Sequence, residues 1–386
     1  MRKFYTAEAV TEGHPDKLCD QIADAILDVC LKNDENSRVA CEVLVTKGNI
    51  IVAGEITSAY EPDVFAVVRK VLSDVGYSSE GIVMDTFVHQ QSPDIAGAVD
   101  TSKERREGVS DNQMDWFQGA GDQGVMIGYA CDETKQLMPM SVVLANRIVR
   151  ELSACRQSSY IQGILPDGKA QVTVEYENGK PVRLDSVVVS CQHTEDKNLK
   201  KLEAEIRKKV LLPALRLLPP DEDTKIFINP SGRFVCGGMD ADTGLTGRKL
   251  MVDSYGSMVP HGGGAFSGKD CSKVDRSAAY MARYIAKNIV AAGLASKCQV
   301  SLAYAIGVAQ PVMVQVDTFG TGNVCADDCL ELAIPLVFGL TPKQIVDTLR
   351  LTRPIFRQTA AFGHFGRKEF PWERTDKVEA LRNAVI

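Results

Sequence analysis

Several features that would decide a protein's class are missing from this chain of 386 residues. No apolar run approaches the ~20 residues that a membrane-spanning helix needs. The N-terminal segment also lacks the apolar core of a signal peptide, because Thr6, Glu8 and Thr11 interrupt it. There is no block of lysine and arginine, and the net charge of −6 argues against a nucleic-acid surface. We therefore expect a cytoplasmic protein that binds neither a membrane nor nucleic acid.

The sequence also shows no pattern of paired cysteines. The eleven cysteines are odd in number, lie between Cys19 and Cys329, and include no CxxC pair. A zinc site and a secreted disulfide framework both fit poorly with this spacing, whereas reduced thiols fit well. The hydrophobic content of 45% and the charged content of 24% are those of an ordinary globular protein. The length predicts two or three domains.

A unit of helix, β-hairpin and helix is predicted three times. In the first copy, Leu18, Ile22, Ile26 and Val29 share one face of a helix over residues 15–30. In the second, Asn178-Gly179 is a strong hairpin signal. The third begins with a helix over residues 272–292 that stops at Gly293, a residue typical of the position after a helix. The other predicted strands are 39–46, 50–57, 170–176, 182–191, 299–305 and 312–316, and the other helices are 62–75, 141–155, 198–212 and 326–338.

This repeat predicts an α+β fold with three similar domains, each laying helices on a mostly antiparallel sheet. We place the domains at residues 1–100, 115–232 and 233–386, the last of which contains a candidate phosphate-binding loop. Because the repeat is one of predicted elements rather than of residues, a coincidence in a mixed protein is the alternative. The tail over residues 356–372 is rich in glycine and aromatics and is predicted to be packed irregular structure.

Two glycine-rich segments can be compared with nucleotide-binding motifs. Gly119 to Gly124 matches GxGxxG, but a polar segment precedes it and a β-like run follows it, so the context of a dinucleotide site is missing. A glycine-rich turn into a strand suffices to explain it. Gly263 to Lys269 fits GxxxxGK, yet Asp270 stands where a Walker A loop needs Ser or Thr. Exposed N–H groups and a helix starting near Ser272 still suit an anion, and a surface loop with solvated lysines is the alternative.

Two carboxylates at predicted helix starts each have two interpretations. Ser272-x-x-Asp275 is a capping box, which the spacing favours, or Asp275 holds a magnesium ion whose other ligands are phosphate oxygens. Pro15 and Asp16 suit any helix start. The run Gly-His-Pro-Asp-Lys also gathers a donor, a carboxylate and a cation at a positive helix end. For His14 alone a structural role is the default.

Taken in order, the motifs GHPDK, GAGDQG, INPSGRF, GLTGRK, HGGGAFSGKD and SKVDRSAAY resemble those of the S-adenosylmethionine synthases, also called methionine adenosyltransferases. The resemblance runs from about residue 3 to residue 380 and includes GHFGR and FPWE. It implies transfer of the adenosyl group of ATP to the sulfur of L-methionine, followed by hydrolysis of tripolyphosphate to pyrophosphate and phosphate. It also implies three domains around a pseudo-threefold axis, and a homodimer with active sites between subunits that often pairs into a tetramer.

The resemblance assigns roles to residues at matching positions. Asp16 and Asp275 would hold two magnesium ions per site, and Glu42 would hold a potassium ion. The residues that would carry catalysis are His14, Lys169, Arg248 and Lys269. ATP would contact His14, Asp167, Lys169, Arg233, Phe234, Asp242, Arg248, Lys249, Ala265 and Lys269. Methionine would contact Glu55, Gln91, Asp122, Asp242 and Lys273.

The expected chemistry accounts for these residue types. A thioether sulfur is neutral and nucleophilic, and its attack on C5′ of ATP loses no proton, so that step requires no general base. It requires in-line positioning and stabilisation of negative charge on the departing tripolyphosphate.

Three places depart from the usual pattern of the family. Met239-Asp240 stands just before Asp242, and an altered methionine pocket is the hypothesis there. Cys271, between the glycine-rich loop and its helix, is a candidate for inhibitory oxidation. The segment 97–118 resembles a mobile active-site gate, and its unusual length predicts an effect on gating and substrate tolerance.

Two rival functions remain open. A different ATP-dependent transferase or phosphohydrolase would turn over ATP without methionine. A degenerate regulatory subunit would have lost a cation or a metal carboxylate, yet the residues concerned are all present: His14, Asp16, Lys169, Lys269, Lys273 and Asp275.

Overall fold

The computed structural model describes residues 2–92, 97, 101–108 and 118–385. The strands are β1 (Arg2–Val10), β2 (Arg38–Thr46), β3 (Asn49–Thr57), β4 (Val83–His89), β5 (Gly124–Cys131), β6 (Ile164–Glu177), β7 (Lys180–His193), β8 (Lys225–Ile228), β9 (Gly244–Leu245), β10 (Lys297–Tyr304) and β11 (Met313–Asp317). The α-helices are α1 (Pro15–Asn33), α2 (Val64–Val75), α4 (Lys103–Arg106), α5 (Met140–Gln157), α6 (Leu199–Ile206), α7 (Leu212–Ala214), α8 (Leu250–Asp253), α9 (Val274–Ala291), α10 (Asp327–Val337), α11 (Pro342–Leu349) and α12 (Val378–Ala384).

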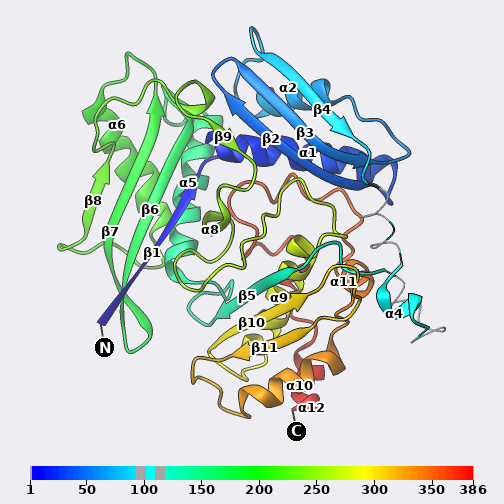
Figure 1. Cartoon of the computed structure of the whole chain (residues 1–386). Coiled ribbons are helices and arrows are strands. Elements are labelled where there is room, and N and C mark those ends of the chain that lie inside the picture. Colours follow the sequence, from blue (N-terminus) through cyan, green and yellow to red (C-terminus); the bar gives the residue numbers. More distant parts are fainter. Residues whose placement is uncertain (1, 93–96, 98–100, 109–117, 386) are drawn as a thin grey trace.

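These elements form three α+β domains (Figure 1). Helix α1 packs on the sheet β4-β3-β2-β9, α5 on the sheet β1-β6-β7-β8, and α9 on the sheet β11-β10-β5. The three helices are largely buried, because each contributes an apolar face to a core that its sheet completes. The predicted fold class is therefore confirmed.

The predicted helix–hairpin–helix units are present in all three domains. They are α1, β2–β3 and α2; α5, β6–β7 and α6; and α9, β10–β11 and α10. Asn178 and Gly179 turn the β6–β7 hairpin with φ of 50° and 79°, the left-handed pair that a two-residue hairpin needs. Gly293 follows α9 with φ 74°, as its position predicted.

Each sheet contains a strand that comes from another third of the sequence. The N-terminal β1 pairs with β6 of the central domain, β5 of the central segment pairs with β10, and β9 of the C-terminal segment pairs with β2. The three segments thus exchange strands in a cycle, which ties the domains to one another. The proposed boundaries at residues 1–100, 115–232 and 233–386 stay a prediction, and they divide the sequence rather than the sheets.

Several elements differ from the sequence prediction. Strands β1, β4, β8 and β9 were not predicted, and two strand pairs, β3–β4 and β7–β8, are parallel. The helix predicted over residues 198–212 is divided into α6, a π-helical turn over Arg207–Leu211, and α7. The tail over residues 356–372 is packed and irregular, as predicted, and Trp372 stacks on Tyr280 at a centroid distance of 3.7 Å.

Two predictions from composition can be compared with the structure. All eleven cysteines are free thiols, as their spacing indicated. Among the described ranges no single helix is long and apolar enough to cross a membrane. One bent pair, Asp327–Val337 with Pro342–Leu349 at 76°, passes that test by length and composition only.

A buried ion pair joins α9 to the tail of the chain. Arg283 donates to both carboxylate oxygens of Glu373 at 3.0 and 2.9 Å, and both side chains are fully buried. Lys287 adds a contact of 2.7 Å to the same carboxylate. Because neutralising one member strands a buried charge, we expect Glu373→Gln to lower the free energy of unfolding by about 3–5 kcal/mol.

Urea unfolding followed by circular dichroism would measure this loss. The matched control is Glu379→Gln, since Glu379 also pairs with an arginine but is 79% exposed on its side chain. An exposed pair contributes little, so the control should unfold at the wild-type urea concentration. Equal effects of the two substitutions would contradict the structural role of the Glu373 pair.

Candidate active site

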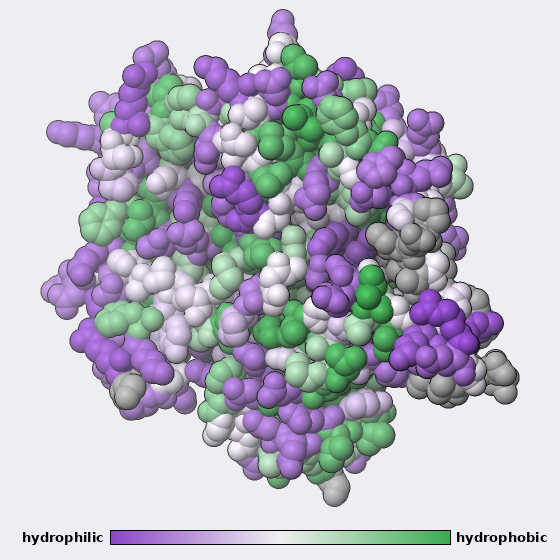
Figure 2. Space-filling model, in the orientation of Figure 1, coloured by the Kyte–Doolittle hydropathy of each residue, from purple (hydrophilic) through white to green (hydrophobic). Residues whose placement is uncertain are grey.

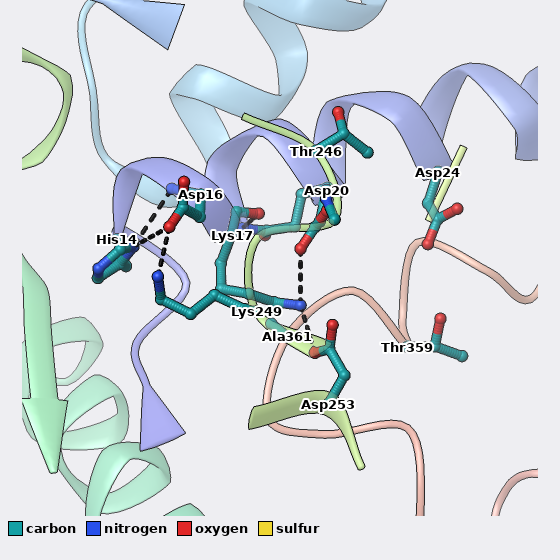
Figure 3. A network of polar contacts seen from close by, with 12 residues as sticks. His14, Asp16, Lys17, Asp20, Asp24, Thr246, Lys249, Asp253, Thr359 and Ala361 are labelled. Carbon is teal, nitrogen blue, oxygen red and sulfur yellow. Dashed lines mark hydrogen bonds and ion pairs between the residues drawn. The ribbon is translucent and has the colours of Figure 1, made fainter. Parts of the chain in front are cut away.

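Charged side chains converge on the N-terminus of α1 (Figure 3). His14 is the N-cap, and its Nδ1 accepts the N–H of Asp16 at 3.2 Å. Pro15 occupies the first helical position, where its missing N–H costs nothing. Asp16 lies in the first turn, next to the positive end of the helix dipole. The residues that start the helix therefore also place the side chains of His14 and Asp16 next to each other.

Asp16 is the buried centre of this region, with only 2% of its surface exposed. Its Oδ1 accepts the N–H of Leu245 at 3.0 Å, and its Oδ2 is paired with the ammonium of Lys249. The Arg248 Nε lies 3.6 Å from Oδ1. Burial alone would raise the pKa of Asp16, but the hydrogen bonds from Lys249 and from the N–H of Leu245 hold it below its ordinary value. Asp16 is therefore an anion that faces two cations from one loop.

His14 is held in its neutral form. Burial, together with the positive charge of Lys249, lowers the pKa of His14 from 6.5 to about 4. Because Nδ1 accepts the Asp16 N–H, the neutral ring carries its proton on Nε2. At neutral pH the imidazole can therefore donate one hydrogen bond from Nε2 to an anionic ligand.

Residues from two other segments act on the same place. The charges of Lys169 and Asp242 both shift the pKa of His14, and those of Asp242 and Lys249 shift that of Asp167. Asp167 accepts the N–H of Gly238 at 2.8 Å, and burial raises its pKa. We define the helix-start group by these members: His14, Asp16, Asp167, Lys169, Asp242, Arg248 and Lys249.

Phe234 and Arg233 lie beside the helix-start group. The Phe234 N–H donates to Nε2 of His193 at 3.0 Å, which fixes the backbone next to the aromatic ring. Gln192 accepts the N–H of Asp167 and donates to the next backbone carbonyl after Phe234. Arg233 pairs with Glu195 at 2.6 Å, and both side chains are mostly exposed.

A second set of predicted residues surrounds the glycine-rich loop before α9. Lys269 Nζ lies 2.5 Å from Asp275 Oδ2, and Gly264 packs so closely that a Cβ there would meet this carboxylate at 2.2 Å. Partial burial raises the pKa of Glu42 on β2, and the charge of Lys269 opposes that rise. We define the glycine-loop group by these members: Glu42, Ala265, Lys269, Lys273 and Asp275.

The capping-box interpretation of Asp275 is wrong. Helix α9 has Lys273 as its N-cap and no side-chain cap hydrogen bond. The Asp275 carboxylate instead binds Lys269, because the loop folds back over the first turn of the helix. Lys273 is paired with Asp270, whose carboxylate also accepts the N–H of Val39 at 2.7 Å.

Besides Lys273, three residues are predicted only for methionine, and they lie at the edges of this region. Glu55 on β3 lies 3.2 Å from His89 Nε2 of the neighbouring β4. The backbone N–H of Gln91 donates to the Thr57 hydroxyl at 3.1 Å. Asp122 is exposed and accepts the N–H of Gln123 at 2.7 Å, in a local turn. No hydrogen bond or ion pair joins these side chains to Lys269 or Asp275 within the described residues.

The two groups are neighbours but are not bonded to each other. In the ranges that the structure describes, no hydrogen bond or ion pair connects a side chain of one group to a side chain of the other. Their loops approach each other at Gly247, where a Cβ would lie 2.6 Å from the methyl group of Ala265. Nor do those ranges contain a cluster of three or more His, Cys, Asp or Glu side chains placed to hold a metal ion.

Comparison with protein families covers nearly the whole chain. Residues 2–97 match the N-terminal domain of S-adenosylmethionine synthetase, residues 117–234 its central domain, and residues 236–374 its C-terminal domain. The chain belongs to the S-adenosylmethionine synthetase family. It is accordingly a methionine adenosyltransferase, and ATP and methionine are the substrates that the family implies. Members of this family use metal cofactors.

Three features of this S-adenosylmethionine synthetase bear on the departures from the family pattern. Met239 and Asp240 lie in a 3₁₀ turn over Gly238–Asp240, with Met239 buried and Asp240 exposed. Burial raises the pKa of Cys271, which disfavours the thiolate and argues against ready oxidation. Of the segment 97–118, residues 98–100 and 109–117 lie outside the described residues.

The described middle of that segment is anchored to the C-terminal domain of the synthetase. The N–H of Lys103 donates to Gly307 at 2.8 Å. The Glu104 carboxylate accepts N–H groups of Ala309 and Gln310 at 2.9 and 3.2 Å. This end of α4 is thus held by one backbone hydrogen bond and by the Glu104 carboxylate.

Sequence reasoning missed some partners within the site of the synthetase. Asp270 had been noted only as the mismatch to a Walker A loop, yet it neutralises Lys273 and anchors β2. His89, the partner of Glu55, lies on a strand that was not predicted. A long-range backbone donor such as Leu245 leaves no signal in the sequence, because any residue can donate its N–H.

Proposed function

We propose that this methionine adenosyltransferase uses the helix-start and glycine-loop groups as one active site, and that it also hydrolyses the tripolyphosphate that it forms. The observation that carries this proposal is the convergence of Lys249, Arg248 and neutral His14 on the buried Asp16. Such a cluster is suited to a polyphosphate that arrives with metal ions. The products would be S-adenosylmethionine, pyrophosphate and phosphate.

Two carboxylates suit two magnesium ions. In both Asp16 and Asp275, one carboxylate oxygen is paired with a lysine ammonium. Among the described residues, neither carboxylate is part of a group of three or more side chains that could hold a metal ion. Mg²⁺ prefers such oxygen donors and completes its shell with water and substrate phosphates. We propose Asp16 and Asp275 as its ligands and Glu42 as a ligand of K⁺. The bound Mg²⁺ would supply positive charge to the phosphate oxygens.

Residues of the chain account for the first step through charge and position. The methionine sulfur forms a bond to C5′ as the C5′–O bond breaks, and the electron pair leaves with the tripolyphosphate. No proton is transferred, so Nε2–H of His14 can serve as a fixed hydrogen-bond donor to the departing oxygen. Lys169, Arg248, Lys249 and Lys269 would stabilise the charge, because preorganised cations need no reorganisation as it develops.

The same cations suit the second step. Water attacks a terminal phosphorus of the bound tripolyphosphate, and the bond to the bridging oxygen breaks to leave pyrophosphate and phosphate. We propose that Phe234 stacks on adenine, with Asp167, Arg233, Asp242 and Ala265 as further ATP contacts. We assign Glu55, Gln91, Asp122, Asp242 and Lys273 to methionine.

We further propose a homodimer with its sites at the subunit interface, paired into a dimer of dimers. Among the described residues no hydrogen bond or ion pair joins the two groups within one chain, which supports this proposal, since a second copy could bring the glycine-loop group of one subunit to the helix-start group of the other. Apolar side chains are exposed on the sheet of the N-terminal domain, including Val83 and Phe87 of β4. Figure 2 shows apolar surface over that domain at the top of the view.

The free cysteines support our proposal of a cytoplasmic location, because the cytosol keeps thiols reduced.

A single assay tests the proposed reaction. The purified enzyme is incubated with ATP, methionine, Mg²⁺ and K⁺, and the products are separated by chromatography. We expect equal amounts of S-adenosylmethionine, pyrophosphate and phosphate. Accumulation of tripolyphosphate would contradict the hydrolysis step, and release of phosphate from ATP without methionine would favour a different acceptor.

The neutral His14 donor makes a separate prediction. Asparagine is as good an N-cap as any residue, whereas alanine loses the cap and about 1 kcal/mol of stability. We expect both His14→Asn and His14→Ala to lower kcat about 10²-fold, because both remove the Nε2 donor. Only the alanine variant should also unfold earlier in a thermal scan. If His14→Asn keeps the wild-type kcat, His14 is a structural cap alone.

A further inference from the structure

Helix α1 carries four aspartates at intervals of four residues: Asp16, Asp20, Asp24 and Asp28. This spacing places them in a row along one side of the helix. The row runs away from the helix-start group, and Asp20 and Asp24 are fully buried. Figure 3 shows Asp16, Asp20 and Asp24 along α1, with Lys17 directed toward Asp20 and Asp253. Burying a row of like charges is unfavourable unless each charge is compensated, because each carboxylate loses its hydration.

Every member of the row accepts backbone N–H groups from a distant segment. Asp16 binds the N–H of Leu245 at 3.0 Å and Asp20 that of Gly247 at 2.9 Å. Asp24 binds the N–H of Gly268 at 2.9 Å. Asp28 binds Phe356 and Arg357, each at 2.9 Å. The row is thus a set of anchors, and the first three hold the two loops of the proposed active site.

The anchored N–H groups lie next to the cations of these loops. Gly247 directly precedes Arg248 and Lys249, and Gly268 directly precedes Lys269. Gly268 has φ 80°, and a Cβ there would lie 1.9 Å from the carbonyl oxygen of Cys41. The loop backbone therefore approaches its neighbours more closely than a residue with a side chain could.

Each of the two fully buried anchors is paired with a buried cation. Lys17 contacts Asp20 at 2.9 Å and Asp253 at 2.5 Å. Arg276 binds Asp24 through two hydrogen bonds of 2.6 and 2.8 Å, and also the carbonyl of Lys269 at 3.1 Å. Asp20 and Asp24 are therefore paired with cations other than Arg248, Lys249 and Lys269.

We propose that Asp20 and Asp24 are positioning residues for adenosyl transfer, which fix the loops of Arg248, Lys249 and Lys269 on α1 before ATP binds. This inference rests on the proposed roles of those cations. One rigid helix then fixes where each of the two loops lies on its own subunit. The exact position of these cations matters for the rate, because moving a catalytic group by 1 Å can lower a rate about 10²-fold.

Asp20 offers the cleanest test, since Lys17 keeps Asp253 as a partner when Asp20 is removed. Asp28→Ala is the matched control, because it removes two anchoring hydrogen bonds of the same row from a segment outside the site. We expect both variants to lower the melting temperature, but only Asp20→Ala to lower kcat, by about 10²-fold, with a smaller change in KM. Asp20→Asn, which keeps an acceptor oxygen, should recover part of kcat.

Equal kcat in Asp20→Ala and Asp28→Ala would overturn the inference. Hydrogen exchange of the wild-type enzyme without ATP tests it independently, should the variant not fold. The amide protons of Gly247 and Gly268 should exchange slowly, and exchange at the rate of an unstructured chain would also overturn it. These outcomes differ from failure of the proposed function, in which the wild-type enzyme itself would form no S-adenosylmethionine.

Discussion

Replacing Asp16 by asparagine is expected to lower kcat about 10³-fold while the fold persists. Asparagine keeps an oxygen that can accept the N–H of Leu245, so the 3.0 Å anchor survives. It loses the charge that faces Lys249 and Arg248 and that would hold Mg²⁺. The loss should therefore appear in turnover and in the concentration of Mg²⁺ that half-saturates the enzyme.

Initial rates of S-adenosylmethionine formation across a Mg²⁺ titration would measure both effects. The matched control is Asp63→Asn, the same chemical change at the N-cap of α2, where asparagine caps equally well. That control should retain wild-type kinetics. An Asp16→Asn enzyme with more than about a tenth of wild-type kcat at all Mg²⁺ concentrations would contradict the role of this carboxylate.

Replacing Lys269 by methionine is expected to lower kcat/KM about 10³-fold. Methionine retains most of the length of the side chain but removes the ammonium that now lies 2.5 Å from Asp275. When ATP and Mg²⁺ are bound, this cation would stabilise the phosphates, so its loss acts on the transition state. The small exposed fraction of the pair, 22% and 15%, keeps water from replacing the charge.

The control for this variant is Lys343→Met on α11. Lys343 forms an ion pair of 2.5 Å with Asp347, but both side chains are about half exposed. That pair contributes little to stability and lies outside the proposed site. We expect wild-type kinetics for Lys343→Met. If Lys269→Met also retains its kcat/KM, the glycine-rich loop does not bind the reacting phosphates.

The sequence predicts local elements of this protein better than their pairing. Apolar spacing over Leu18, Ile22 and Ile26 indicates α1, and Asn178-Gly179 indicates the β6–β7 hairpin, because both signals are local. The exchange of β1, β5 and β9 among the three sheets joins residues far apart in the chain, and no local pattern reports such a partner. The same limit applies to the parallel strands β4 and β8.

In the candidate site, too, local features could be predicted from the sequence and long-range contacts could not. The helix start at Pro15 and Asp16 follows from helix-capping rules, but the meeting of Asp16 with Lys249 depends on tertiary packing across 233 positions. The capping box at Ser272 and Asp275 satisfies the spacing rule, yet Lys269 competes successfully for the carboxylate. A charged donor forms a stronger bond than a backbone N–H, which explains why the local rule failed.

Cys271 and Asp24 illustrate a further limit of sequence reasoning. Polar and charged residues are usually exposed, so burial of Asp24 against Arg276 could not be predicted from composition. Cys271 is a candidate for oxidation from its place in the chain, but burial raises the pKa of its thiol. Burial is a property of the whole fold, and it decides the chemistry of both side chains.

The joining of the two groups into one site between subunits can be tested with a hybrid dimer. An Asp16→Asn chain and a Lys269→Met chain, each inactive alone, are co-expressed with different tags, and dimers carrying both tags are isolated. If each site takes one group from each subunit, one site of the hybrid carries both changes and the other none. The hybrid should then show about half of the wild-type rate. A hybrid as inactive as its parents would show that each site is built within one chain and would contradict this account.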